Sequence, residues 1–274
     1  MIEKLNFLSE TQCRQLSQEH GSPLYIYSEE IIQRQCQQAL DFPNNYGLTV
    51  RYALKANPNS AILSIIDNAG LHFDASSEFE VKRCLDAGIA PEKIQLTGQQ
   101  MPKHYLSLIK ESGVRFNACS LRQLELWGQN FPGSSLSIRI NPGLGSGSNR
   151  KTNVGGPSSS FGIWHEQIEE AEAIIAKYNL DLNRIHTHIG SGSAPDVWKH
   201  VAQMSLAFAK RFTSVKTVNL GGGFKVGRMA SEQSTCLQDV GSSVTEAFAE
   251  IEAETGRKHH LEIEPGTYLI ANSG

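Results

Sequence analysis

The sequence contains few of the features that mark membrane, secreted or nucleic-acid-binding proteins. No run approaches the roughly 18 apolar residues that span a bilayer, and Met1 to Glu10 lack the apolar core of a secretory signal. The 25 basic residues are interspersed with 28 acidic ones, so no basic stripe could follow a nucleic-acid backbone. The five cysteines are scattered and form no CxxC pair, which argues against a disulfide framework or a zinc ribbon. We therefore predict a cytoplasmic protein with a small-molecule partner, and neither nucleic acid nor membrane as a partner.

Eight short apolar segments alternate with helical patterns. The predicted strands cover residues 48–55, 71–75, 93–97, 114–118, 136–141, 184–189, 216–220 and 260–264, with helices at 60–69, 78–87, 121–129, 166–178, 197–212 and 240–254. This alternation is typical of parallel strands joined by right-handed crossovers, in an open doubly wound sheet or a closed barrel. Eight repeats favour an α/β fold of the (β/α)8 TIM-barrel type. We expect residues 1–47 to form a helical and extended segment that leads into a barrel over residues 48–274.

Polar residues or glycines stand at the ends of six predicted strands. They are Lys55, Asp74, Arg139, His188, the run 221–223 and Glu264. In a (β/α)8 barrel the carboxyl ends of the strands meet at one mouth, where the active site lies. Each residue alone has an easy structural explanation, but equivalent positions for all six favour one shared site.

Lys55 and Glu264 bring an amine and a carboxylate to this mouth. Lys55 ends an apolar strand and precedes Ala-Asn-Pro-Asn, so the chain turns at once. A partly desolvated amine has a lowered pKa and can form an imine with a carbonyl, although a lone strand-end lysine more often reaches for solvent. Glu264 precedes Pro265-Gly266 and could act as a general base or as the partner of a cation.

Two glycine-rich segments have different interpretations. Gly221, Gly222 and Gly223 follow a strand, where their N–H groups can surround a phosphate, although three glycines also suit a tight turn. The segment 143–148 lacks the third glycine of GxGxxG and the lysine of a P-loop, so we predict a flexible loop. The connection that continues to Ser160 is longer than a usual βα loop, which favours a mobile lid or an interface.

His186 and His188 are two residues apart on a predicted strand. Their side chains therefore point to one face, roughly 6.6 Å apart. No HExxH motif, nearby carboxylate or suitably spaced cysteine supports a zinc site, so we predict no metal. A histidine at a barrel mouth serves better as a flat ring on which a planar cofactor stacks.

Several short motifs occur in a fixed order along the chain. They are Tyr52 to Asn57, Phe73-Asp74 with Glu80, Arg139 with Asn141-Pro142, Ser160 to Gly162, His188 to Ser191, the triple glycine with Phe224, and Glu264 to Gly266. Together they resemble the fold-type III pyridoxal-phosphate decarboxylases, which include the diaminopimelate, ornithine and arginine decarboxylases. The RINP and HIGS forms are most similar to the diaminopimelate branch.

The resemblance implies an alanine racemase-like barrel that binds pyridoxal 5'-phosphate (PLP). It implies three catalytic residues: Lys55 forms the Schiff base with the cofactor, His188 stacks on its ring, and Glu264 pairs with the ring nitrogen. The other cofactor-binding residues it implies are Asp74, Arg139, Ser191, Gly221, Gly222, Gly223, Gly266 and Thr267. Ser191 and the glycine backbone would hold the phosphate.

The implied reaction is decarboxylation of a diamino acid, with meso-diaminopimelate converted to L-lysine in lysine biosynthesis. Two departures bear on this expectation. Thr267 replaces the arginine that usually follows Glu-Pro-Gly, and Ser160 replaces a lysine common before Phe-Gly. The sequence ends at Gly274, without the β-rich C-terminal domain that family enzymes carry and that donates residues across a dimer interface, and we expect a homodimer in the full-length form. We therefore expect impaired turnover by this chain alone.

Two other functions suit the same barrel. A stand-alone PLP-binding protein of cofactor homeostasis would bind the cofactor without turnover, although the Glu264 motif speaks against it. An amino-acid racemase would need a second acid/base group, which the sequence does not reveal.

Overall fold

The computed structural model describes residues 7–274 except 103–105, 144–155, 157–158, 191 and 230. Eight of the strands form a closed ring. These are β1 Leu48–Ala53, β2 His72–Ala75, β3 Ile94–Thr97, β4 Arg115–Ala118, β5 Ser135–Asn141, β7 Asp181–Thr187, β8 Thr217–Asn219 and β9 His260–Ile263. The ring runs β4-β3-β2-β1-β9-β8-β7-β5 and closes through β4–β5, with every pairing parallel. The predicted (β/α)8 barrel is confirmed.

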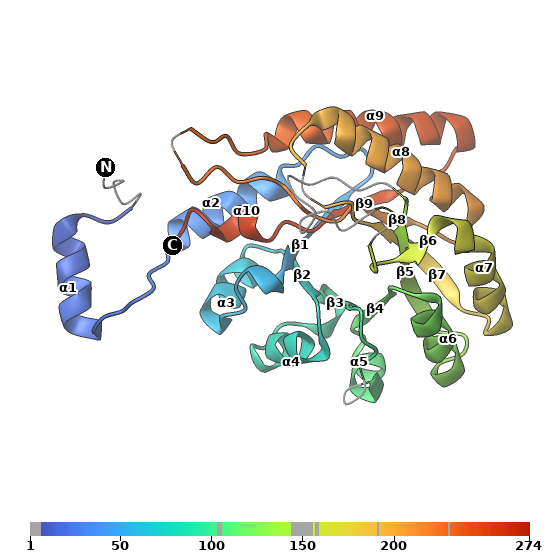
Figure 1. Ribbon diagram of the computed structural model, residues 1–274, viewed down its shortest axis with the longest axis horizontal. Helices are drawn as coiled ribbons and strands as arrows, with labels where there is room; N and C mark the ends of the chain where they lie inside the picture. Colours follow the sequence, from blue (N-terminus) through green and yellow to red (C-terminus); the bar gives the residue numbers. More distant parts are fainter. Residues whose placement is uncertain (1–6, 103–105, 144–155, 157–158, 191, 230) are drawn as a thin grey trace.

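Helices surround this ring, and the first alone among the described helices stands apart from it (Figure 1). They are α1 Glu10–His20, α2 Glu29–Leu40, α3 Ser60–Asn68, α4 Glu78–Asp86, α5 Leu106–Ser112, α6 Leu121–Asn130, α7 Ile168–Lys177, α8 Pro195–Arg211, α9 Leu237–Thr255 and α10 Thr267–Ile270. Serine caps start two of them soon after a strand ends: Ser77 accepts from the N–H of Glu80, and Ser120 from that of Gln123. These caps keep the connecting loops short and so bring the helix starts to the barrel mouth. None of the described helices is long and apolar enough to cross a membrane.

Apolar and polar side chains alternate along the barrel strands. The outward residues, such as Tyr52 and Phe73, join the hydrophobic core with Ile66 of α3. The inward residues are largely polar and still buried: Arg51, Asp74, Gln95, Asn117, Ser137, Arg139, Arg184, His186, Asn219 and Glu262. A buried polar group without a partner costs about 1 to 3 kcal/mol, so this interior depends on hydrogen bonds between strands.

The amino-terminal half of the barrel interior contains an ion cluster around Glu262. Its carboxylate lies 2.9 Å from Nη2 of Arg51 and 3.0 Å from Nε of Arg184, and Nη1 of Arg115 is 3.9 Å away. Burial raises the pKa of Glu262, but the arginines outweigh it and hold that pKa at about 2. Asn219 donates through Nδ2 both to Glu262 and to Glu264, at 3.2 and 2.7 Å, and so links this cluster to the mouth.

Two segments differ from or extend the predicted pattern. A short strand that the sequence did not indicate, β6 Ile163–Trp164, pairs with β5 just before α7. The predicted flexible loop at 143–148 and the long connection to Ser160 fall mostly outside the described residues. At the other end of the chain, α1 buries no residue and stands away from the barrel (Figure 1).

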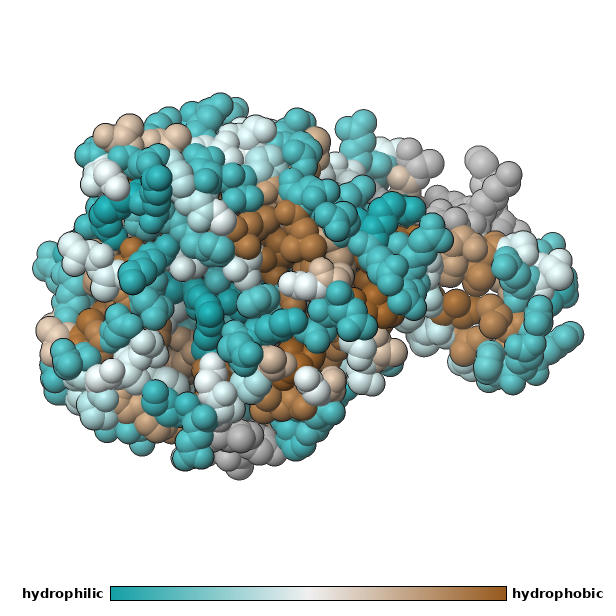
Figure 2. Space-filling model, turned by 180° about the vertical axis from the view of Figure 1, so that it is seen from behind, coloured by the Kyte–Doolittle hydropathy of each residue, from teal (hydrophilic) through white to brown (hydrophobic). Residues whose placement is uncertain are grey.

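The segment that joins α1 to α2 exposes apolar side chains. Leu24 and Tyr27 are each 40% exposed and Tyr25 is 87% exposed. We call α1 and this joining segment the arm. Figure 2 shows apolar surface gathered where the arm leaves the barrel. The arm rejoins the body at Ser28, whose N–H donates to the carbonyl oxygen of Ser273 at 2.7 Å.

Candidate active site

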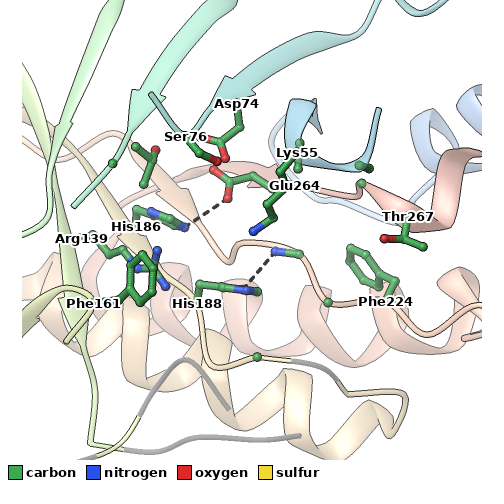
Figure 3. Close-up of a pocket in the computed structure, with 18 of the residues that line it drawn as sticks. Lys55, Asp74, Ser76, Arg139, Phe161, His186, His188, Phe224, Glu264 and Thr267 are labelled. Atoms are coloured by element: carbon green, nitrogen blue, oxygen red, sulfur yellow. Dashed lines mark hydrogen bonds and ion pairs between the residues drawn. The ribbon is translucent and has the colours of Figure 1, made fainter. Parts of the chain in front are cut away.

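A cavity of about 1260 Å³ opens at the carboxyl ends of the barrel strands. It brings together most of the predicted site residues (Figure 3). The lining residues among them are Lys55, Asp74, Arg139, His188, Gly222, Gly223, Glu264, Gly266 and Thr267. Gly221 is not among the residues that line it, and Ser191 lies outside the described residues. Residues more than 200 positions apart in the sequence therefore share one space.

Lys55 was predicted as the last residue of a strand, but it lies just beyond the observed one. β1 ends at Ala53, and Lys55 is in a single 3₁₀ turn, Leu54–Ala56, because the chain bends immediately after the strand. Figure 3 shows its side chain reaching into the cavity between Glu264 and His188. Its amine is therefore available to a ligand in the cavity.

His188 presents a neutral ring to the cavity. The N–H of Gly222 donates to Nδ1 at 3.2 Å, which leaves the ring proton on Nε2. Burial, followed by the charges of Arg139 and Lys55, holds the pKa of His188 well below 6.5. A neutral aromatic ring is a suitable flat surface for a planar ligand.

Glycine is required beside this ring. Gly221 has a φ of +72°, and a Cβ on it would lie 2.5 Å from Nδ1 of His188. A Cβ on Gly222 would overlap the carbonyl oxygen of Glu264. The backbone passes too close to its neighbours for any side chain, and it exposes Gly222 and Gly223 to the cavity.

Glu264 is a buried carboxylate held by three side chains. Its Oε1 accepts from Asn219 Nδ2 at 2.7 Å and from Gln95 Nε2 at 3.0 Å, and its Oε2 lies 3.3 Å from His186 Nε2. Burial raises the pKa of Glu264, but His186, His188 and the bond from Asn219 outweigh it and hold the pKa well below its usual range. Glu264 is therefore an anion that faces the cavity.

Asp74 lies nearby, and its pKa is shifted in the opposite direction to that of Glu264. Burial first, and then the charge of Glu264, raise the pKa of Asp74 from 3.8 to about 8. One amide nitrogen, Nε2 of Gln95, lies 3.3 Å from Oδ1 of Asp74 and 3.0 Å from Oε1 of Glu264. Two carboxylates this close do not both ionise readily, so Glu264 carries the charge and Asp74 the proton at neutral pH.

Arg139 has a donor without a partner. Its guanidinium lies 4.7 Å from the ring centre of Phe161, and no described residue accepts from its buried Nη2. A buried cation with an unused donor on a cavity wall suits an anionic ligand. Thr267, at the start of α10, adds a hydroxyl to the same cavity.

Sequence reasoning assigned no site role to four buried residues of this region. His186 was paired with His188 on one strand face, where the structure has both, but its contact with Glu264 was not foreseen. Gln95, Asn117 and Asn219 were not singled out. Each stands at an inward position of a predicted strand, so the alternation of period two was the signal that could have found them.

A closed parallel barrel with a polar cavity at the carboxyl ends of its strands defines the class of (β/α)8-barrel enzymes. The chain matches the family model described as "Pyridoxal-dependent decarboxylase, pyridoxal binding domain" over residues 29–271. It therefore belongs to this family of pyridoxal-dependent decarboxylases, and the predicted family and its PLP cofactor are confirmed.

Named relatives agree with this membership. The chain is 35% identical over 264 residues to diaminopimelate decarboxylase of Streptomyces coelicolor, covering 93% of this chain and 58% of that protein. It is 32% identical over 267 residues to diaminopimelate decarboxylase of Escherichia coli K12, covering 94% of this chain and 62% of the relative. A crystal structure of diaminopimelate decarboxylase superposes with a TM-score of 0.89 at 31% identity, over 97% of this chain and 63% of that one. The chain thus spans about three fifths of the length of these relatives.

The described residues fit the three polar parts of PLP. Lys55 supplies an amine for the aldehyde, and Glu264 an anion for the pyridine nitrogen. The unused donor of Arg139 and the backbone of Gly223 offer contacts to an anionic phosphate, whereas the N–H groups of Gly221 and Gly222 already donate to Asn219 and His188. The neutral ring of His188 borders the space between them.

Proposed function

We propose that this chain is the cofactor-binding barrel of a decarboxylase that converts meso-diaminopimelate to L-lysine, a step of lysine biosynthesis. The observation that carries the proposal is the meeting of Lys55 and Glu264 in one cavity, from opposite ends of the barrel sequence. The relatives named diaminopimelate decarboxylase support the choice of substrate.

Each residue has a role that follows from its environment. The amine of Lys55 would hold the cofactor at its aldehyde. Glu264, anionic and fixed by its three partners, holds a proton at the pyridine nitrogen. When bound, PLP supplies an electron sink for the bond to the departing carboxylate. His188, neutral at physiological pH, keeps the ring plane fixed without adding positive charge.

The wider cavity completes the proposed site. Arg139 and the backbone of Gly223 would hold anionic groups of the cofactor or substrate, and Gly266 and Thr267 border the same space. Asp74, which carries a proton at neutral pH, adds no second negative charge beside Glu264. Ser191 stays a predicted phosphate contact.

The domain organisation and assembly are also proposals. We propose that residues 1–47 lead into a barrel of residues 48–274, and that the active enzyme is a homodimer in which a β-rich domain completes the site. The share of the relatives that this chain covers supports the further domain alone, because about two fifths of their length has no counterpart here.

Covalent capture of the cofactor tests the central role. We expect that borohydride reduction of the chain with PLP labels Lys55, as mapped by peptide mass spectrometry, and that Lys55→Ala abolishes the label. Lys225→Ala is the matched control, because it removes another lysine that lines the cavity and should leave the label in place. Labelling of the Lys55→Ala variant at the wild-type level would refute the assignment.

Turnover tests the substrate. Carbon dioxide and lysine are measured with meso-diaminopimelate, ornithine and arginine, using this chain and a fusion to the C-terminal part of the Streptomyces coelicolor relative. We expect lysine from meso-diaminopimelate in the fusion. Cofactor binding without product from any diamino acid would favour a PLP-binding protein, and exchange of the Cα proton without carbon dioxide would favour a racemase.

A further inference from the structure

A row of hydrogen-bonded side chains reaches His186, whose Nε2 lies 3.3 Å from Oε2 of Glu264 at the cavity. It begins at Ser137 on β5, continues through Asn117 on β4 and reaches His186 on β7. Ser137, Asn117 and His186 are at most 2% exposed. Ser137 and Asn117 do not line the cavity, so neither contacts a ligand there.

The orientation of the Asn117 amide decides which groups in this row donate hydrogen bonds and which accept them. The hydroxyl of Ser137 donates to Oδ1 of Asn117, so the amide nitrogen faces the other way. That nitrogen lies 2.7 Å from Nδ1 of His186 and 3.2 Å from the hydroxyl oxygen of Thr97. An amide nitrogen can only donate, so Nδ1 of His186 must accept.

The direction decides where His186 carries its proton. With Nδ1 as an acceptor, the ring proton lies on Nε2, and Nε2 is 3.3 Å from Oε2 of Glu264. Figure 3 marks the contact between His186 and Glu264 with a dashed line. The opposite tautomer would turn a lone pair toward the carboxylate, and two acceptors would then face each other in a buried space.

We propose that Asn117 is a positioning residue, which fixes His186 as the Nε2–H tautomer and thereby holds the Glu264 carboxylate in its orientation toward the cavity. The inference rests on the proposed function for the use made of Glu264. It adds two residues, Ser137 and Asn117, that lie outside the cavity and act on Glu264 through His186. Asn219 and Gln95 hold the other oxygen of Glu264, so the carboxylate is fixed at both oxygens only when His186 donates.

The ring nitrogens of His186 report the tautomer directly. In the full chain with isotope-labelled histidine and without PLP, we expect ring-nitrogen chemical shifts of the Nε2–H form. The His186→Gln variant identifies the signal. Asn117→Ala should bring in the second tautomer, and Asn117→Asp should place a proton on Nδ1, because a carboxylate there accepts instead of donating.

The dissociation constant for PLP is the second measurement, followed by tryptophan fluorescence. Loss of a hydrogen bond to a charged group predicts about tenfold weaker binding by Asn117→Ala. Ser137→Ala, a smaller change, should act in the same direction and covers the case in which Asn117→Ala fails to fold. Ser135→Ala is the matched control, because its hydroxyl on the same strand is exposed and bonds Asp181 instead.

The two measurements distinguish a failure of this inference from a failure of the proposed function. Wild-type signals with a proton on Nδ1 would overturn the inference, and so would an unchanged tautomer or an unchanged PLP dissociation constant in both Asn117→Ala and Ser137→Ala. A wild-type chain that takes up no PLP would refute the proposed function, while the ring signals, recorded without PLP, still decide the tautomer.

Discussion

Asp74 and Glu264 border the same cavity, yet their surroundings favour opposite charge states. His186 and Asn219 stabilise the anion at Glu264. At Asp74, burial and the neighbouring negative charge of Glu264 instead stabilise the protonated form. The difference arises from which neighbours each carboxyl has, since both are almost fully buried. A sequence gives the residue type at both positions but not these neighbours, so the charge states could not be predicted from it.

The raised pKa of Asp74 predicts a pH-dependent stability. Between about pH 4 and pH 8 the folded chain keeps a proton that the unfolded chain has released. The contribution of Asp74 to the free energy of unfolding is therefore fully present below this window and is lost as the pH rises through it. We expect the unfolding free energies of the wild type and of Asp74→Asn, measured in urea, to diverge across this window by up to about 5 kcal/mol, with the wild type losing stability relative to the variant as the pH rises. Asp239→Asn, at an exposed site, should keep the wild-type slope.

Gly221 offers a second test at this scale. Gly221→Ala combines a positive φ with a Cβ that meets His188, so we expect a loss of about 3 kcal/mol in unfolding free energy. Gly88 has a similar φ of +81° but open space around it, so Gly88→Ala should cost only about 1 kcal/mol. Equal losses in chemical denaturation would show that the contact with His188 contributes nothing.

At the scale of elements, the sequence predicted the strands well because apolar runs bounded by turns mark them. All eight predicted barrel strands are present, with ends displaced by a few residues at most. Lys55 shows why ends are harder: the run of apolar residues continues past Ala53, but the chain already turns there. The strand β6 has two residues and no period, so no pattern could reveal it.

The candidate site was predictable to a similar degree, and for the same reason. Residues at strand ends, such as Lys55 and Glu264, are found because the barrel makes those ends converge. The partners inside the barrel, such as Gln95 and Asn219, depend on which inward side chains meet across the ring. That pairing follows from strand order and register, which one sequence does not reveal.

The caps of α4 and α6 allow a matched test of how helices shape the mouth. Ser77→Ala and Ser120→Ala each remove one bond to a backbone N–H, so each should lower the unfolding free energy by about 1 kcal/mol. Only Ser77 also lines the cavity. We therefore expect Ser77→Ala alone to weaken PLP binding, measured by fluorescence titration. Equal weakening by both variants would point to a general loss of order.

At the scale of the whole molecule, the arm and the barrel contribute unequally to stability. Helix α1 buries no residue, whereas α2 buries Ile31, Ile32, Cys36 and Ala39 against the barrel. Removal of residues 1–21 should therefore shift the thermal midpoint by less than about 2 °C in calorimetry. Ile32→Ala, which leaves a hole in the core, should lower it by several degrees. A large shift in the truncated chain would indicate that the arm contacts the body more than the structure shows.

The polar lining of the barrel has a consequence for how its chemistry can be adjusted. Asn219 donates to both Glu262 and Glu264, so it links the arginine-rich cluster in the barrel interior to the carboxylate that faces the cavity. Replacing a charge at the far end alters the field that Glu264 experiences without changing the shape of the ligand's space. Substitutions at Arg51 or Arg184 would thus change the acidity of Glu264, although neither arginine lines the cavity or would contact a ligand there.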